Sequence, residues 1–306
     1  MRFKVLFFVA MILGMVACNN TESPMDVIVG GDVETTVQVA IPEASRAEGV
    51  EGFNLSTLGS DFELRFILEI YNTEDDATSP DNESRSIEEQ SCSRMVQYSS
   101  VPSTAFDVRL APERNYRFVV WADIVAKQDE RNAEWDYDHY YETSSLKNVT
   151  IIDRSWVCNA LDRDAYTGFK DVNNFTSASS INIQLVRPFA MLRVVTVNDD
   201  TVVTKLGVDY TSVPKTFNAY TGKIREATTK SHVIDTHNNV NVTPNNIVDG
   251  ERTLFTDFIF ASDQDTSFNF TMSAYNDSET PFKEIPFEVA IKRNCLTTVK
   301  GKLLNN

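Results

Sequence analysis

The sequence predicts an all-β protein with two tandem β-sandwich domains, and three observations lead to this prediction. Short segments in which apolar and polar residues alternate recur along most of the 306 residues, and this is the period of a strand with one face in a core. Turn-forming residues separate these segments, and no amphipathic helix longer than a turn or two interrupts them. The chain is also long enough to bury two cores of ordinary size. Sandwiches are the commonest way to bury strands of this kind.

The clearest strand is Asn115–Ile124 (NYRFVVWADI), in which every second residue is apolar or aromatic, as expected when one face lies in a core. Ser267–Asn276 (SFNFTMSAYN) repeats this pattern, and Phe268 follows Tyr116 by 268 − 116 = 152 residues. The motif aromatic-x-Phe-x-apolar-x-Ala thus occurs once in each half of the chain. We interpret the two segments as the same strand in two similar domains, although four matching positions can also arise by chance.

Other segments of alternating residues are taken as further strands. The main ones are Glu34–Ile41, Phe62–Tyr71, Ser93–Tyr98, Thr104–Leu110, Lys205–Tyr210, Thr253–Ala261, Phe287–Ile291 and Thr297–Leu304. Pro188 interrupts the apolar run Ile181–Val197, so it should lie at a bulge or between two strands. We expect an irregular segment at Ser155–Ser180. We expect a long polar segment without a strand at Thr221–Asn246. The small residues Ser177–Ser180 set the predicted domain boundary, with domains at 34–179 and 180–306.

The first segment predicts export and a lipid anchor. Arg2 and Lys4 precede an apolar run at residues 5–16, and Ala17 then precedes Cys18. The sequence around Cys18 (MVAC) resembles a bacterial lipobox, which implies a signal peptide at 1–17 and a lipidated tether at 18–33. The alternative is an ordinary signal peptide with an accidental cysteine.

Charge and cysteine content argue against several kinds of site. The net charge of −16 argues against nucleic-acid binding, which needs clustered Lys and Arg. Beyond Cys18, three cysteines remain, at positions 92, 158 and 295, and an odd number gives no complete disulfide framework. No metal site and no cofactor are predicted, because the cysteine spacings are far from CxxC and no histidine is near a cysteine in the sequence.

An enzyme is not predicted. The chain has no G-x-S-x-G, H-E-x-x-H or Walker motif, and its three histidines make a catalytic Ser/His/Asp set hard to assemble. The aromatic segment Trp135–Tyr141 is open to two interpretations. It could form a platform on which sugar rings stack, or a loop that folds back and caps a sandwich. Capping is favoured for Tyr140 and Tyr141, whereas Trp135 and Tyr137 stay candidates for ligand stacking.

Several short motifs together resemble the fimbrillin-like exported lipoproteins of Bacteroides-type bacteria, a group that includes type V pilus subunits. They are the lipoprotein signal, the WAD strand, Tyr140-Tyr141 running into LKNVT at 146–150, RPFA at 187–190 and KRNCLT at 292–297. The resemblance implies two transthyretin-like sandwiches and a lipid-anchored protein of the outer membrane or cell surface. It implies a pilus subunit, an accessory or anchor component, or an adhesin, and it supplies no catalytic residues.

Two functional hypotheses follow from these observations. In the first, the protein joins neighbouring pilus subunits by strand addition, giving up Glu34–Ile41 as an edge strand after proteolysis at Arg46. Arg46 lies among small and acidic residues in a connector that a trypsin-like protease could reach. In the second, the protein is a monomeric surface lipoprotein that keeps this strand and binds a glycan for nutrient uptake.

Overall fold

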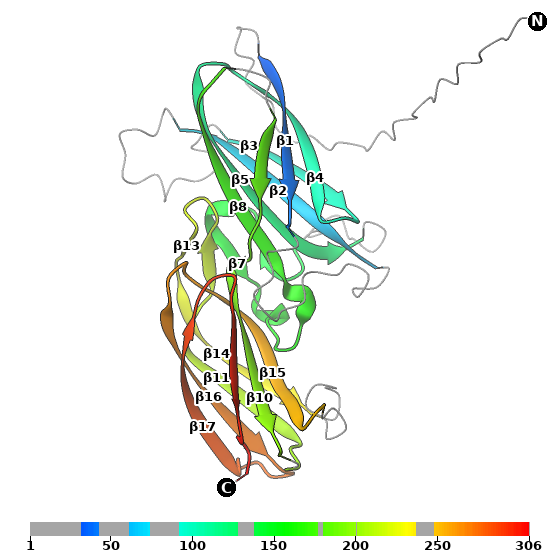
Figure 1. The fold of residues 1–306 in the computed structure, drawn as a ribbon, viewed down its shortest axis with the longest axis vertical. Coiled ribbons are helices and arrows are strands. Elements are labelled where there is room, and N and C mark those ends of the chain that lie inside the picture. Colours follow the sequence, from blue (N-terminus) through cyan, green and yellow to red (C-terminus); the bar gives the residue numbers. More distant parts are fainter. Residues whose placement is uncertain are drawn as a thin grey trace, which may run out of the picture.

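The computed structural model describes residues 32–42, 61–73, 92–127, 138–176, 180–199, 201–236 and 248–305. These residues form an elongated molecule in which two β-sandwiches are stacked end to end (Figure 1). Helical structure in these ranges is limited to three short 3₁₀ turns at the junction. None of it has the length and apolar character that crossing a bilayer would require. The predicted all-β class and the sandwich architecture are confirmed.

The N-terminal sandwich packs a four-stranded sheet against a three-stranded sheet, with one apolar core between them. The four-stranded sheet has the order β3-β2-β5-β8 (Cys92–Ser99, Phe62–Asn72, Arg114–Ala126, Ala165–Phe175). The three-stranded sheet has the order β4-β1-β9 (Ser103–Leu110, Val33–Ala40, Ile181–Gln184).

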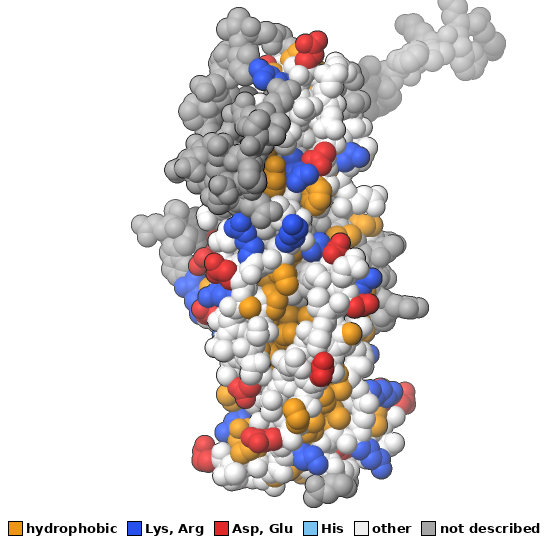
Figure 2. Space-filling view, turned by 90° about the vertical axis from the view of Figure 1, so that its left-hand side faces the viewer, with side chains coloured by type: hydrophobic (Ala, Val, Ile, Leu, Met, Phe, Trp, Pro, Cys, Tyr) orange, Lys and Arg blue, Asp and Glu red, His pale blue; other side chains and the backbone are white. Residues whose placement is uncertain are grey.

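The C-terminal sandwich is built in the same way. Its larger sheet has the order β14-β11-β16-β17 (Ala227–Asp235, Lys205–Pro214, Thr266–Tyr275, Lys283–Ile291). Its smaller sheet has the order β15-β10-β18 (Glu251–Phe260, Phe189–Val197, Leu296–Gly301). On the face in Figure 2, hydrophobic side chains gather over this sandwich, and half-buried apolar residues of β17 and β18 pack against its core.

The two sandwiches share one topology, strand for strand. Strands at the same place in the corresponding sheets are equivalent. In chain order, β1, β2, β3, β4, β5, β8 and β9 of the N-terminal sandwich correspond to β10, β11, β14, β15, β16, β17 and β18 of the C-terminal sandwich. The only parallel pairings involve equivalent strands, β1 with β9 and β10 with β18, among the described residues. Asn115–Ile124 lies in β5 and Ser267–Asn276 overlaps β16, and both are third in their four-stranded sheet. The interpretation of the two segments as one repeated strand is therefore confirmed.

A linking segment, which we define as residues 138–163, joins the two sandwiches. It contains β6 (Tyr141–Glu142), η6 (Leu146–Asn148), β7 (Val149–Ile151), η7 (Asp153–Ser155) and η8 (Leu161–Arg163). With β12 (Thr216–Asn218) and β13 (Lys223–Ile224) it forms a small sheet of order β13-β12-β7-β6. One continuous core connects Trp121 of β5, Tyr141 of this segment and Phe189 of β10. The two sandwiches are thus joined by packing as well as by the chain.

The outer face of β5 corrects one expectation. The alternating pattern predicts one buried face, yet the strand is buried on both faces from Phe118 to Val125. Phe118 and Val120 face the N-terminal core, whereas Val119 and Trp121 belong to the core that runs into the linking segment. The positions expected to face solvent are covered because the linking segment returns over this sheet.

Two long strands occur where none is predicted. β8 lies inside the segment expected to be irregular, and β14 lies inside the segment expected to be polar and without a strand. Both are edge strands of their sheets and carry many exposed side chains. Their sequences therefore lack the regular apolar spacing of a strand with a covered face. Pro188 lies between β9 and β10, as expected.

Strand pairing also shows where in the chain the N-terminal sandwich ends and the C-terminal sandwich begins. β9 follows the predicted boundary at 179/180, but it pairs with β1 of the N-terminal sandwich. The change therefore falls between Gln184 and Phe189. Two buried ion pairs stabilise this joint. Arg163 Nη1, at the end of the linking segment, lies 2.5 Å from Asp257 Oδ1, and Oδ2 of the next residue, Asp164, lies 2.6 Å from Arg187 Nη2.

Candidate functional site

The first described strand, β1, is the element that the strand-addition hypothesis treats as removable, and its side chains alternate between the core and the surface. Val37, Val39 and Ile41 face the core and are 0%, 1% and 8% exposed. The alternate positions, Thr36, Gln38 and Ala40, face outward. This is the alternation that the sequence predicts, so β1 presents one continuous apolar face to the sheet opposite.

β1 is the middle strand of its sheet, so the expectation of an edge strand is wrong. It pairs antiparallel with β4 along all eight of its residues, and parallel with β9 from Val37 to Ala40. The Ile41 N–H donates to the Pro102 carbonyl at 2.9 Å, and the Leu185 N–H donates to the Ala40 carbonyl at 2.9 Å. The position differs from the prediction because β9, from beyond the predicted boundary, closes the second side.

Removal of β1 would therefore leave a slot rather than a shortened sheet. Two strand edges, of β4 and β9, would lose their backbone partners, and unpaired edges are templates for another strand. The core beneath, which includes Phe66 and Phe118, would lose the side chains that cover it. An incoming segment could restore both kinds of contact at once.

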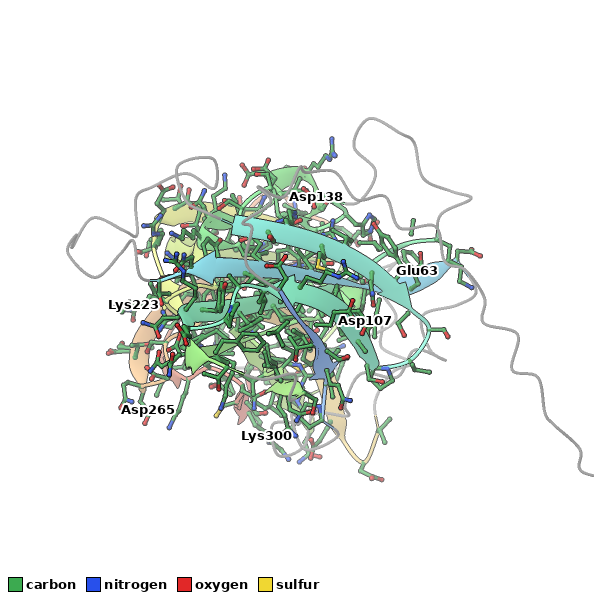
Figure 3. All side chains as sticks on the ribbon, turned by 90° about the horizontal axis from the view of Figure 1, so that it is seen from above. Glu63, Asp107, Asp138, Lys223, Asp265 and Lys300 are labelled. Atoms are coloured by element: carbon green, nitrogen blue, oxygen red, sulfur yellow. The ribbon has the colours of Figure 1, made fainter. Side chains whose placement is uncertain are left out.

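Charged contacts contribute little to holding β1. The Arg109–Glu34 ion pair joins side chains that are 67% and 72% exposed, and water screens such pairs. Thr36 Oγ1 donates to Asp107 Oδ1 at 2.9 Å on the same outer surface. Figure 3 labels Asp107 on β4 beside the blue β1 strand. Backbone hydrogen bonds and apolar burial hold the strand, so salt should affect its release only weakly.

The four predicted site residues lie outside the described residues. They are Cys18, Arg46, Trp135 and Tyr137. Lipidation at Cys18, cleavage at Arg46 and ligand stacking at Trp135 and Tyr137 therefore stay predictions.

Capping of the sandwich by Tyr140 and Tyr141 is confirmed. Both rings are buried, and Tyr141 stacks on Phe189 with ring centroids 5.7 Å apart. The Tyr140 hydroxyl donates to Asp162 Oδ2 at 2.6 Å, and the Tyr141 hydroxyl donates to the Arg163 carbonyl. Burial raises the pKa of both phenols, so they remain neutral hydrogen-bond donors. Neither ring offers a face to a sugar.

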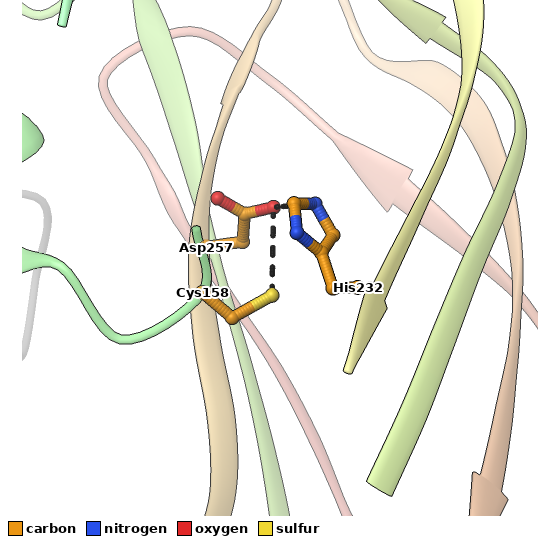
Figure 4. Close-up of side chains that lie close together, drawn as sticks. All are labelled: Cys158, His232 and Asp257. Carbon is orange, nitrogen blue, oxygen red and sulfur yellow. Dashed lines mark hydrogen bonds and ion pairs between the residues drawn. The ribbon is translucent and has the colours of Figure 1, made fainter. Parts of the chain in front are cut away.

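One group of potential ligand residues was not found from the sequence. Cys158, His232 and Asp257 are distant in the chain, yet one ligand atom from each lies within 4.8 Å of the other two (Figure 4). No local spacing predicts this group, because its members come from the linking segment and two strands of different sheets. Only the tertiary structure brings them together.

Solved structures with a similar fold come from Bacteroides and Porphyromonas species. One is described as a candidate polysaccharide-binding protein (DUF1812) of Bacteroides thetaiotaomicron, with 12% identity, a TM-score of 0.49, and coverage of 83% of this chain and 80% of that one. Another is a candidate cell adhesion protein of Bacteroides eggerthii, with 12% identity, a TM-score of 0.44, and coverage of 90% and 89%. A third is the fimbrial anchor protein Mfa2 of Porphyromonas gingivalis, with 12% identity, a TM-score of 0.43, and coverage of 85% and 82%.

No curated protein matches the sequence. One protein family, described as a family of unknown function (DUF6562), matches residues 26–306. This match spans both sandwiches and includes every described residue. The chain belongs to this family of unknown function, DUF6562.

Proposed function

We propose that this protein is a lipid-anchored component of the bacterial cell surface that joins pilus-type assemblies, as a subunit, an accessory component or an anchor. The position of β1 carries the proposal. A middle strand that lies at the start of its domain can be withdrawn without unthreading the rest of the chain. Its equivalent in the second sandwich, β10, follows directly from β9 and has no such freedom. The proposed role is structural or adhesive rather than catalytic.

Strand addition explains how such a protein would bind its neighbour. An extended segment of the next subunit would pair with β4 and β9 and place apolar residues where Val37 and Val39 now lie. Backbone hydrogen bonds would provide affinity, and alternate side chains would set the register. The motifs that resemble fimbrillin-like lipoproteins agree with this mode of assembly.

The order of the chain links anchoring to assembly. A cut at Arg46 falls between β1 and β2, so it would separate the predicted lipid at Cys18, together with β1, from both sandwiches. An uncut chain would stay on the membrane with its slot filled. A cut chain that loses β1 would leave the membrane with its slot open. Anchoring and strand acceptance would thus be successive states of one protein.

Limited trypsin treatment of the folded protein tests strand acceptance. We expect the first cut at Arg46, followed by dimers or longer chains once β1 is released. Arg46→Ala should resist this cut and stay monomeric. Arg225→Ala, at an exposed arginine near the start of β14, is the matched control and should behave as the unmodified protein. Size-exclusion chromatography with light scattering measures the outcome.

Two results of the trypsin experiment would contradict strand acceptance. One is resistance at Arg46 in the folded protein. The other is cut protein that stays monomeric with β1 still bound. Either would favour the alternative, a monomeric surface lipoprotein that binds glycans.

Replacement of Cys18 tests the lipid anchor separately. The mature protein should begin at Cys18 and partition into detergent. Cys18→Ala should accumulate as an unprocessed or unlipidated chain that stays in the aqueous phase. Normal membrane anchoring of Cys18→Ala would contradict the anchor and leave the strand-acceptance experiment unaffected.

A further inference from the structure

Three side chains from separate parts of the chain converge at one corner of the C-terminal sandwich (Figure 4). Cys158 lies in the linking segment between η7 and η8, His232 lies on β14, and Asp257 lies on β15. Asp257 Oδ2 is 3.9 Å from Cys158 Sγ and 3.8 Å from His232 Nε2. Each residue thus points one potential metal-ligand atom into the same small space.

The fold explains why these residues meet. β14 and β15 are edge strands of the two sheets of this sandwich, so their side chains line its open seam. The linking segment lies over that seam, where Trp156 is 1% exposed and packs edge-on against His232 at 6.0 Å between ring centroids. The ring of Tyr210 packs on His232 from the β11 side, at 5.5 Å. These contacts hold the imidazole in one orientation.

One ring nitrogen of His232 is buried and makes no hydrogen bond. His232 is 6% exposed, and its Nε2 atom is buried without a hydrogen-bond partner. A buried polar atom in this state costs free energy, which native structures avoid unless a partner or function compensates. A neutral imidazole has one ring nitrogen with a free lone pair, which can form a bond to a metal ion.

Asp257 is fixed so that one lone pair remains available. The Oδ1 atom of Asp257 accepts a hydrogen bond from Arg163 Nη1 at 2.5 Å. It accepts a second from the backbone N–H of Phe258 at 2.8 Å. Its Oδ2 atom accepts from the Tyr210 hydroxyl at 2.9 Å. A carboxylate oxygen has two lone pairs, so Oδ2 can still bind a cation on the side that faces Cys158 and His232.

The chemistry of the three donors identifies the kind of ion. Thiolate, imidazole and carboxylate are the protein ligands of zinc, whose bonds to S, N and O are about 2.0–2.3 Å long. A tetrahedral ion with such bonds would hold its ligand atoms about 3.3–3.6 Å apart, which follows from these lengths. The two separations from Asp257 Oδ2, 3.8 and 3.9 Å, exceed this range by a few tenths of an ångström, and all three ligand atoms lie within 4.8 Å of one another.

We propose that Cys158 Sγ, His232 Nε2 and Asp257 Oδ2 bind one zinc-class divalent ion. Binding would replace the S–H bond of Cys158 with an S–metal bond, and the proton would pass to solvent. A pocket of about 400 Å³, lined by Cys158, His232 and Asp235 among others, opens beside the group and leaves room for water at the fourth position. The ion would fasten the linking segment to both sheets of the C-terminal sandwich.

Cobalt(II) titration of the full chain in detergent, after treatment with a chelator, tests the site. We expect one equivalent to produce a thiolate-to-cobalt charge-transfer band and the visible bands of a tetrahedral ion, and zinc(II) to remove them. Cys158→Ser should lose the thiolate band. His232→Gln should bind zinc at least roughly tenfold more weakly, a loss that even outer-shell changes can cause.

Two matched variants control for the residue types. Cys295→Ser removes another half-buried free cysteine, and His139→Gln removes another described histidine outside this group. Both should bind cobalt as the unmodified protein does. No thiolate band in the unmodified protein, or an unchanged band in Cys158→Ser, would overturn the proposal. If Cys158→Ser does not fold, alkylation of the unmodified protein decides, because zinc should protect Cys158 and equal labelling with and without zinc would refute the site.

Discussion

At the residue scale, Phe118 and Phe270 occupy the same position in two equivalent strands. They are 0% and 3% exposed, and each lies in the core of its own sandwich. Phe118→Ala and Phe270→Ala should each lower the free energy of unfolding by about 3–5 kcal/mol, because each empties space that neighbouring side chains cannot fill. Denaturant unfolding followed by circular dichroism measures the loss.

Phe282→Ala is the matched control for these two variants. Its ring is 37% exposed, so truncation removes much less buried surface. The change should cost clearly less than either core variant. A loss for Phe118→Ala as small as that for Phe282→Ala would contradict the assignment of β5 to a core.

Asp199 gives a residue-scale prediction that depends on pH. Burial opposes ionisation of this carboxyl, but hydrogen bonds from Thr201, Thr196 and the Leu304 backbone N–H outweigh that effect and lower its pKa. The stabilisation is therefore fully present above the unfolded-state pKa of about 3.9 and is lost as the pH falls through the lower folded-state value. The bond from Leu304 holds the segment that follows β18.

Asp199→Asn should therefore be less stable than the unmodified protein at pH 7. The difference should shrink as the pH falls below about 4, where the carboxyl of the unmodified protein also becomes protonated. Thermal unfolding at a series of pH values measures it. A difference that stays constant down to pH 2 would show that the charge of Asp199 does not contribute.

At the element scale, Gly168 allows β8 and β9 to cross closely. A Cβ atom at this position would lie 2.8 Å from the Gln184 carbonyl oxygen and 3.1 Å from Leu185 Cδ2. Backbone cannot move aside as a flexible side chain can, so Gly168→Ala should destabilise the protein by about 1–3 kcal/mol, as overpacking does. Chemical denaturation measures the change.

Gly207→Ala is the control, because a Cβ atom there meets nothing closer than 3.6 Å. It should be neutral or slightly stabilising, since alanine restricts the unfolded chain more than glycine does. Equal effects at the two positions would mean that the crossing of β8 and β9 can relax.

At the scale of the whole molecule, Trp121 couples the two sandwiches. Its ring is fully buried and packs edge-on against Tyr141 of the linking segment, with centroids 5.3 Å apart. The same core continues to Phe189 and Phe260 of the C-terminal sandwich. We therefore expect the unmodified protein to unfold in one calorimetric transition.

Trp121→Ala should lower stability by about 3–5 kcal/mol and split the transition in two, because the joint would lose its central side chain. Differential scanning calorimetry measures both effects. A single transition in Trp121→Ala, with the ratio of calorimetric to van't Hoff enthalpy unchanged, would show that other contacts couple the sandwiches.

Local sequence patterns predict the all-β class, the core strands and the repeat of β5 in β16. These features depend on local alternation, which is visible wherever one face of a strand is buried and the other is not. For this reason the alternating patterns locate the ends of β1 and β2 to within a residue or two. Pro188 is expected at a bulge or between two strands because proline cannot donate to a sheet, and it lies between β9 and β10.

Features that depend on distant neighbours cannot be predicted from local patterns and become visible in the folded chain. Edge strands such as β8 and β14 have little buried surface, so their sequences contain no regular apolar spacing. The middle position of β1 depends on β9, which follows it by about 140 residues and leaves no mark on the sequence of β1. Cys158, His232 and Asp257 meet for the same reason. Side-chain spacing records what a residue's own element buries, whereas pairing and convergence depend on which elements the folded chain brings together.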